Sequence, residues 1–173
     1  MYIRHGIMNL KIKDSSVKIR LFSENDISFL KKVYFSTREE ELKQVTDWSE
    51  EMKTAFLKQQ FDAQHEYYQK NYLEAFFYII EKNKKEAGRL YYQENFQESI
   101  RIIDIALLPA FQKKGIGTQI LKGIFERAKK IERNVTIHVE SFNPVMNLYI
   151  RLGFEKISET NGVYHLLQWN YKN

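Results

Sequence analysis

The stretch from Arg101 to Lys130 constrains the fold of this chain more than any other. Its first part, 101–108, is rich in aliphatic and β-branched residues and predicts a buried strand. Pro109 ends that strand, because proline has no N–H to give to a strand ladder. A short glycine-containing loop follows, and behind it apolar residues recur at helical spacing. These are Ile120, Leu121, Ile124, Phe125 and Ala128. The sequence therefore predicts a strand, a loop and a helix in direct succession.

The loop between this strand and helix has the features of a phosphate-binding site. At a helix start several backbone N–H groups point outward without partners, and the helix dipole adds positive potential. Gly115 and Gly117 would let an anion approach the backbone, and Lys113 and Lys114 favour a polyanion. The run is neither a Walker A loop nor the G-x-G-x-x-G of a dinucleotide fold. From the residues alone, a phosphate loop and an ordinary helix start both remain open.

Length and composition limit the class of protein. A chain of 173 residues, 43% of them hydrophobic and 14% aromatic, favours one globular domain with its own core. The absence of cysteine excludes a disulfide framework, a thiolate nucleophile and cysteine-ligated metal sites. The four histidines lie far apart, so we expect no metal. No run reaches the ~20 apolar residues of a membrane span, and the first ten residues lack a secretory signal. We therefore expect a cytoplasmic protein.

Alternation, turn residues and helix caps predict the remaining elements. We expect strands at 17–22, 75–81, 86–93, 135–140, 154–157 and 162–169, and helices from Ser23 to about Tyr34, from about Ser49 to Asn71, and from Pro144 to Gly153. Thr37 with Glu40 also fits a capping box. In the long helix, Met52, Phe56, Ala63 and Tyr67 predict the side that faces the core. Residues 1–16 carry no strong pattern and predict an extension or a short extra strand.

Two segments resemble a known family. A strand ended by proline and followed by Q-x-x-G-x-G, here DIALLPAFQKKGIG, resembles motif A of the GCN5-related N-acetyltransferase (GNAT) superfamily, which moves an acyl group from acyl-CoA to an amine. NPVMNLYIRLGF, at 143–154, is similar to motif B of the same superfamily. Together with VKIRLFSENDISFL near the start, the resemblance covers nearly the whole of 17–173 in the expected order. It implies a GNAT-like domain over 17–173, with 1–16 outside it.

The resemblance implies a fold and a cofactor site. The fold would be of the α/β (α+β) class, a mixed and mostly antiparallel sheet of about six to seven strands with about four flanking helices. The sheet would splay open between its fourth and fifth strands, here 101–108 and 135–140, and acetyl-CoA would lie in that cleft as co-substrate. The pantetheine arm would contact Ala106, Leu107 and Leu108, and Asn143 would lie near it. The pyrophosphate would take the loop formed by Gln112, Lys113, Lys114, Gly115, Ile116, Gly117 and Thr118.

The resemblance also suggests catalytic residues. Tyr149 matches the tyrosine near the CoA sulfur that commonly acts as general acid, although a helix tyrosine can equally be a packed core residue. Asn143 and Tyr149 lie six positions apart (149 − 143), one fewer than the commonest spacing, so the role of Tyr149 is the better supported.

A general base is needed because only a neutral amine attacks a thioester. His138 falls where several members carry a glutamate base, and Glu140 shares its side of the strand by alternation. Asp104, between isoleucines, is the other candidate, because a carboxylate on a buried strand needs a partner or a raised pKa. His138 and Asp104 also have purely structural interpretations.

These features predict an N-acetyltransferase that moves an acetyl group from acetyl-CoA to an amine of a small-molecule or peptide acceptor, by direct attack in a ternary complex. The alternative is a catalytically silent acyl-CoA-binding sensor or interaction domain. A third reading is nucleic-acid binding through the basic surface, since the net charge is +5. We expect no specific nucleic acid and no membrane as partner. A homodimer stays open, because many members of the superfamily are dimers.

Overall fold

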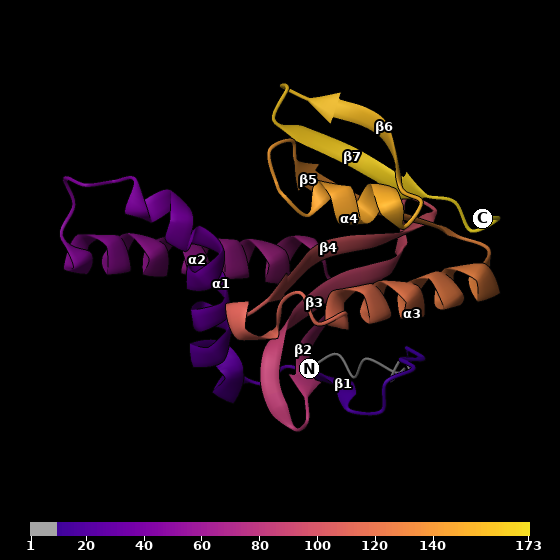
Figure 1. Cartoon of the computed structure of the whole chain (residues 1–173), viewed down its shortest axis with the longest axis horizontal. Helices are drawn as coiled ribbons and strands as arrows, with labels where there is room; N and C mark the ends of the chain where they lie inside the picture. Colours follow the sequence, from indigo (N-terminus) through magenta and orange to yellow (C-terminus); the bar gives the residue numbers. More distant parts are fainter. Residues whose placement is uncertain (1–9) are drawn as a thin grey trace.

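The computed structural model describes residues 10–173, which form a seven-stranded sheet with helices on both faces (Figure 1). The strands are β1 (Val17–Leu21), β2 (Phe76–Lys82), β3 (Lys85–Phe96), β4 (Ser99–Leu107), β5 (Asn134–Glu140), β6 (Glu155–Thr160) and β7 (Tyr164–Trp169). The α-helices are α1 (Ile27–Lys43), α2 (Glu50–Asn71), α3 (Ile116–Ile131) and α4 (Met146–Arg151), and two 3-10 helices are η1 (Glu24–Asp26) and η2 (Pro109–Phe111). The mixed α/β class and the number of strands agree with the prediction.

The order of strands in the sheet is β1-β2-β3-β4-β5-β7-β6. Neighbouring strands are antiparallel except β4 and β5, which are parallel and joined through α3. The β2–β3 hairpin turns through Asn83 and Lys84, both with positive φ (51° and 63°), as a two-residue hairpin loop requires. The predicted turn at this point is confirmed.

Two apolar cores lie on opposite faces of the sheet. On one face, α3 contributes Ile116, Ile120, Leu121 and Ile124 and α4 contributes Tyr149, all buried against β3, β4 and β5. On the other face, α1 and α2 bury residues such as Leu30 and Phe61 against β2 and β3. Since the two faces have different partners, side chains that alternate along β4 and β5 point into two different environments.

The sheet splays open between β4 and β5. Their parallel ladder runs only from Ser99, opposite Asn134, to Ile102, opposite Ile137. Beyond this point the two strands continue without pairing, which leaves one edge of β4 over 103–107 half-buried rather than covered. The predicted opening between the fourth and fifth strands is therefore confirmed.

The N-terminal part differs from the prediction in three places. Helix α1 continues to Lys43 instead of ending near Tyr34, and Thr37 lies inside it, where its hydroxyl donates to the Tyr34 carbonyl at 2.6 Å instead of capping a new helix. The predicted core-facing side of α2 is also wrong. Met52 and Tyr67 are more than half exposed (53% and 55%), and the buried residues of this helix are Leu57 and Phe61.

Of the predicted extension 1–16, residues 1–9 lie outside the described part of the chain. Residues 10–16 form no strand, but Leu10 is buried in the core beneath α3 and the Asp14 N–H donates to the Gln119 side chain at 3.0 Å. Within residues 10–173, none of the helices has both the length and the apolar character needed to cross a membrane.

Candidate active site

The loop between β4 and α3 presents unpaired backbone donors. After η2 the chain passes through Lys113 (φ 57°) and Gly115 (φ 77°), and α3 begins at Ile116. Among the backbone hydrogen bonds of residues 10–173 outside helices and strands, none is donated by the N–H of Lys113, Lys114 or Gly115. These N–H groups, with the first N–H groups of α3, form an exposed concentration of positive potential at the helix start.

A hydrogen bond to β4 helps to fix the shape of the loop. The Gln112 side chain donates from Nε2 to the Leu107 carbonyl at 2.8 Å, which ties the loop back to the end of β4. A Cβ added at Gly115 would meet no atom within 4 Å, so the space beside this backbone is open. A ligand can therefore approach the main chain here without displacing protein atoms.

The second half of β4, next to this loop, has one edge whose main-chain groups are not paired with β5. A β-bulge between β3 and β4 sets two β4 residues, Ile103 and Asp104, on the side of α1 and α2, because the register shifts from Tyr92–Ile102 to Tyr91–Asp104. Past the bulge, 105–107 continues along the open side of the splay. An extended ligand could add hydrogen bonds to this edge, as an extra strand would.

Tyr149 is held against the opposite side of the splay. Gly153, with φ 94°, ends α4 as predicted, and the N–H of Phe154 reaches back to the Tyr149 carbonyl at 3.0 Å. The Phe154 ring packs edge-on against the Tyr149 ring at 5.4 Å between centroids. The Tyr149 side chain is 3% exposed, and burial, followed by the negative charge of Asp104, raises the pKa of its hydroxyl well above the usual range. The phenol is therefore protonated at neutral pH.

Asp104 is already paired. Its carboxylate accepts from Arg89 Nη2 at 2.7 Å and Nε at 3.3 Å, and Arg89 is 2% exposed between the rings of Tyr34 and Tyr91. The same guanidinium donates to the Gln64 side chain at 3.2 Å. Without this carboxylate the Arg89 guanidinium would be buried with no countercharge, which is costly in free energy. This arrangement suits a positioning residue better than a proton acceptor.

His138 points to the same side of the sheet and is held by a cation. Its Nδ1 lies 3.1 Å from Arg101 Nη1. Because a guanidinium can only donate, Nδ1 must accept, and the proton of the neutral ring then sits on Nε2. Burial, followed by the charge of Arg101, lowers the pKa of His138 and keeps the ring neutral. In this state the free nitrogen of His138 is a hydrogen-bond donor, not a base.

Glu140 retains free acceptor capacity. It lies two residues beyond His138 on β5, and its Oε1 is 3.9 Å from Arg38 Nη1, a long ion pair. Arg38 itself donates to Glu41 at 3.1 Å and lies over the Tyr34 ring. Of the predicted base candidates, Glu140 is the one whose carboxylate has no close hydrogen bond among residues 10–173.

Asn143 lies in the turn that precedes α4. The helix begins at Met146, with Val145 in the cap position, so the prediction that Pro144 is its first residue is wrong. Asn143 instead shapes the turn before the helix: its Oδ1 accepts from the Val145 N–H at 3.1 Å and its carbonyl from the Met146 N–H at 3.0 Å. A side-chain turn of this kind ends the β5 segment and directs the chain into α4.

Comparison with known proteins agrees with this geometry. The model of the acetyltransferase (GNAT) domain matches residues 74–156, which run from β2 through the loop to α4 and into the start of β6. This segment is similar to the GNAT acetyltransferase domain family. A comparison with curated protein sequences finds no match.

Solved structures of acetyltransferases share the fold over about nine tenths of the chain. The PaiA N-acetyltransferase of Thermoplasma acidophilum, solved with coenzyme A, is 18% identical with a TM-score of 0.68, and covers 90% of this chain and 99% of its own. A GNAT acetyltransferase of Elizabethkingia anophelis with bound acetyl-CoA is 18% identical with a TM-score of 0.56, at 90% and 99% coverage. A chimera of Vibrio cholerae spermidine N-acetyltransferase SpeG and hSSAT is 17% identical, with a TM-score of 0.61, at 91% and 97% coverage.

Sequence reasoning missed three arginines at this candidate site. Arg38, Arg89 and Arg101 all lie on the α1–α2 side of the splay and contact predicted site residues. Arg89 and Arg101 did carry a signal, because each is a charged residue next to buried apolar residues of its strand. A buried charge needs a partner, so such positions point to a polar network.

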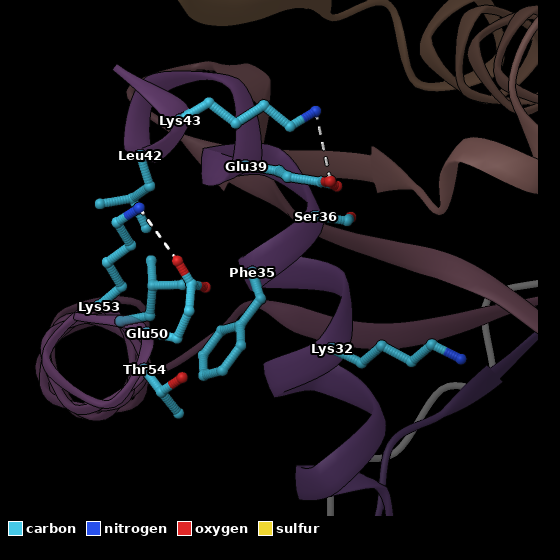
Figure 2. Close-up of a pocket in the computed structure, with 10 residues that line it drawn as sticks. Lys32, Phe35, Ser36, Glu39, Leu42, Lys43, Glu50, Lys53 and Thr54 are labelled. Atoms are coloured by element: carbon cyan, nitrogen blue, oxygen red, sulfur yellow. Dashed lines mark hydrogen bonds and ion pairs between the residues drawn. The ribbon is translucent and has the colours of Figure 1, made fainter. Parts of the chain in front are cut away.

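A groove between α1 and α2 lies apart from these residues. It has a volume of about 400 Å³ and is lined by the residues labelled in Figure 2 together with Leu57. Ion pairs join Lys43 to Glu39 at 3.4 Å and Lys53 to Glu50 at 3.1 Å along its walls. None of the catalytic candidates lines it, and Tyr34 and Arg38 are not among its lining residues. The groove is therefore not part of the site at the splay.

Proposed function

We propose that this protein is an acetyl-CoA-dependent N-acetyltransferase. The observation that carries the proposal is the placement of unpaired donors in the 112–118 loop at the end of a splayed β4, with the protonated Tyr149 hydroxyl across the splay. The solved PaiA and Elizabethkingia anophelis acetyltransferases of the same fold contain coenzyme A and acetyl-CoA. The domain would span 17–173.

The residues present fit acetyl-CoA as co-substrate. The open space beside Gly115 and the N–H groups of Lys113, Lys114 and Gly115 suit a pyrophosphate, and the lysine side chains add charge. The pantetheine arm would run along Ala106, Leu107 and Leu108, with Asn143 close by, and Gln112 to Thr118 would hold the phosphates. When bound, acetyl-CoA supplies the thioester.

The transfer step follows from the positions of the side chains. The acceptor nitrogen attacks the thioester carbonyl carbon, the C–S bond breaks, and the ammonium proton released from nitrogen must leave. Glu140 would take that proton directly or through water, because Asp104 is bound by Arg89 and the lone pair of His138 by Arg101. Tyr149 would donate its hydrogen bond, and finally its proton, to the departing thiolate. No covalent enzyme intermediate is required.

Binding is tested by calorimetric titration of acetyl-CoA into the wild type and into Gly115→Glu, which places a carboxylate in the phosphate loop. We expect binding by the wild type and loss of binding by a folded variant. Because position 115 has φ 77°, any side chain there is strained, so Gly115→Asn is the matched control: it tolerates that backbone and adds no charge. Failure of the wild type to bind acetyl-CoA would overturn the proposal.

Turnover separates an enzyme from a silent acyl-CoA sensor. The protein is assayed with acetyl-CoA and each amine of a library, and release of the free CoA thiol should identify an acceptor. In Tyr149→Phe we expect kcat to fall about 10²- to 10⁴-fold, the range of one acid–base group, with acetyl-CoA affinity unchanged. Tight binding of acetyl-CoA without acetylation of any amine in the library would favour the sensor.

A further inference from the structure

Arg101 is a buried cation whose hydrogen-bond partners among residues 10–173 are all neutral. It is 7% exposed, its Nε donates to Thr136 Oγ1 at 2.9 Å, and its Nη1 donates to His138 Nδ1 at 3.1 Å. The Phe96 ring lies against one side of the guanidinium, 4.6 Å from ring centroid to Cζ. Two of the five N–H donors of an arginine are thereby used. The guanidinium keeps donors for another acceptor.

The other arginines at the splay are balanced by acids, and Arg101 is not. Arg89 pairs with Asp104 at 2.7 Å, and Arg38 with Glu41 at 3.1 Å. Within residues 10–173, no carboxylate forms an ion pair with Arg101, and burial lowers its pKa while the nearby Tyr72 hydroxyl is the only group that raises it. An uncompensated buried charge is costly, so a structural role alone does not account for it.

The position of Arg101 relates it to the proposed reaction. Arg101 lies opposite Thr136 in the last paired stretch of β4 and β5, next to the point where the strands part. His138 follows on β5 at the start of the opening and is partly exposed, with its Nε2–H free to donate. Glu140 is two residues further on the same side, about 7 Å along the strand. An anion held by Arg101 and His138 would lie within a few bonds of an amine held at Glu140.

We propose that Arg101 and His138 bind a carboxylate of the acceptor, so that the acceptor is an amino-acid-like amine and not a polyamine. This inference rests on the proposed acetyltransferase function. A planar carboxylate matches the fork of a guanidinium and can accept a further hydrogen bond from His138 Nε2–H. A second ammonium group, as a polyamine carries, would be repelled from the same place.

The test compares matched acceptors. L-amino acids, short ω-amino acids and dipeptides are each assayed beside the corresponding amide, with spermidine as the cationic probe. We expect the wild type to prefer an acid over its amide about 10- to 100-fold in kcat/KM, the range of a hydrogen bond to a charged group. In Arg101→Gln that preference should disappear, and Arg101→Lys should restore part of it.

The controls separate this inference from the proposed function. Acetyl-CoA affinity and thermal stability are measured for each variant, and Lys18→Gln removes one exposed positive charge from β1, at the far edge of the sheet. Equal or better use of the amides or spermidine by the wild type overturns the carboxylate site while leaving the transferase intact. So does an unchanged acid-to-amide ratio in Arg101→Gln, or acetyl-CoA binding with no acid acetylated. Failure to bind acetyl-CoA overturns the proposed function itself.

Discussion

Asp104 and Arg89 join β3 to β4 beneath α1 and α2, and their side chains are 17% and 3% exposed. In such a pair each charge compensates the other, and removing one partner leaves the second charge buried without an acceptor. The pair also sets the charge that Tyr149 feels, because Asp104 contributes to the raised pKa of its hydroxyl. The pair therefore links the stability of the sheet to the electrostatics of the site.

At the residue scale, we predict that Asp104→Asn lowers the free energy of unfolding by about 3–5 kcal/mol, the usual cost of breaking a buried pair. Urea denaturation measures this. Asp62→Asn is the matched control, since Asp62 is 53% exposed and its ion pair with Lys31 at 3.0 Å is of the surface kind, which contributes about 0–1 kcal/mol. Equal losses in the two variants would show that the Arg89 pair has no special weight.

Single residues show how far the sequence predicts the site. The glycines and lysines of the loop could be identified as candidate site residues because a phosphate loop has a local sequence pattern. Tyr149 could be identified only because its segment resembles a family motif. The pairing of Asp104 with Arg89 and of His138 with Arg101 was not, because the partners are 15 and 37 positions apart and meet only through strand register. The tautomer of His138, and with it the preference for Glu140 as base, depends on that register.

At the element scale, β3 and β4 approach closely along the stretch of β4 whose opposite edge would carry the pantetheine arm. A Cβ added to Gly88 would lie 2.1 Å from the Ala106 carbonyl oxygen, which is main chain and cannot rotate away. The absence of a side chain at Gly88 thus allows β4 to pack against β3 up to the start of the phosphate loop. The sequence alone does not reveal such a close approach of two strands, because a glycine within a strand can have several structural causes.

We predict that Gly88→Ala destabilises the protein by about 1–3 kcal/mol or more, as overpacking does, and weakens acetyl-CoA binding, because β4 must shift at Ala106. Denaturant titration and calorimetry measure the two effects. For stability, Gly117→Ala serves as the comparison: its added Cβ would come no closer than 4.0 Å to Leu107, and alanine favours a helix. A stable Gly88→Ala with normal acetyl-CoA affinity would contradict the close approach.

Helices α1 and α2 were the elements predicted least well. The Thr37 hydroxyl donates its hydrogen bond to the Tyr34 carbonyl of its own helix, so the capping pattern at Thr37 does not start a new helix. In α2, apolar residues occur on more than one side, and the Phe56 ring packs against Trp48 at 5.2 Å outside the main core. Periodicity alone could not select the face with Leu57 and Phe61, because the choice depends on where α1 crosses it.

At the scale of the whole molecule, the order of elements followed from sequence because strands, turns and helix starts each have their own local chemistry. The splay did not follow from local chemistry, and only the family resemblance predicted it. The same global arrangement brings titratable groups from several elements into contact with other side chains. His65 on α2 stacks on Phe61 at 5.5 Å, His138 lies beside Arg101, and Asp26 binds Arg20 at 2.8 Å.

These surroundings give the stability of the molecule a definite dependence on pH. Burial lowers the pKa of His65 and of His138, so below about pH 6.5, the ordinary value for histidine, the unfolded chain takes up protons that the folded chain resists. The Arg20 hydrogen bonds hold the pKa of Asp26 far below its usual range, so a second loss begins below about pH 4. Both effects have the same sign, and the free energy of unfolding should fall as pH falls.

We predict a constant free energy of unfolding between about pH 8 and pH 7, a decline from about pH 6.5 to pH 5, and a steeper decline below about pH 4. Urea titrations at these pH values measure it. His138→Gln and His65→Leu should each flatten the first decline and leave the second, and Asp26→Asn should do the reverse, since its stabilising pair with Arg20 is then absent at every pH. Stability that rises between pH 7 and pH 5 would contradict the neutral state of the two histidines, and with it the hydrogen bond that makes His138 a donor at the acceptor site.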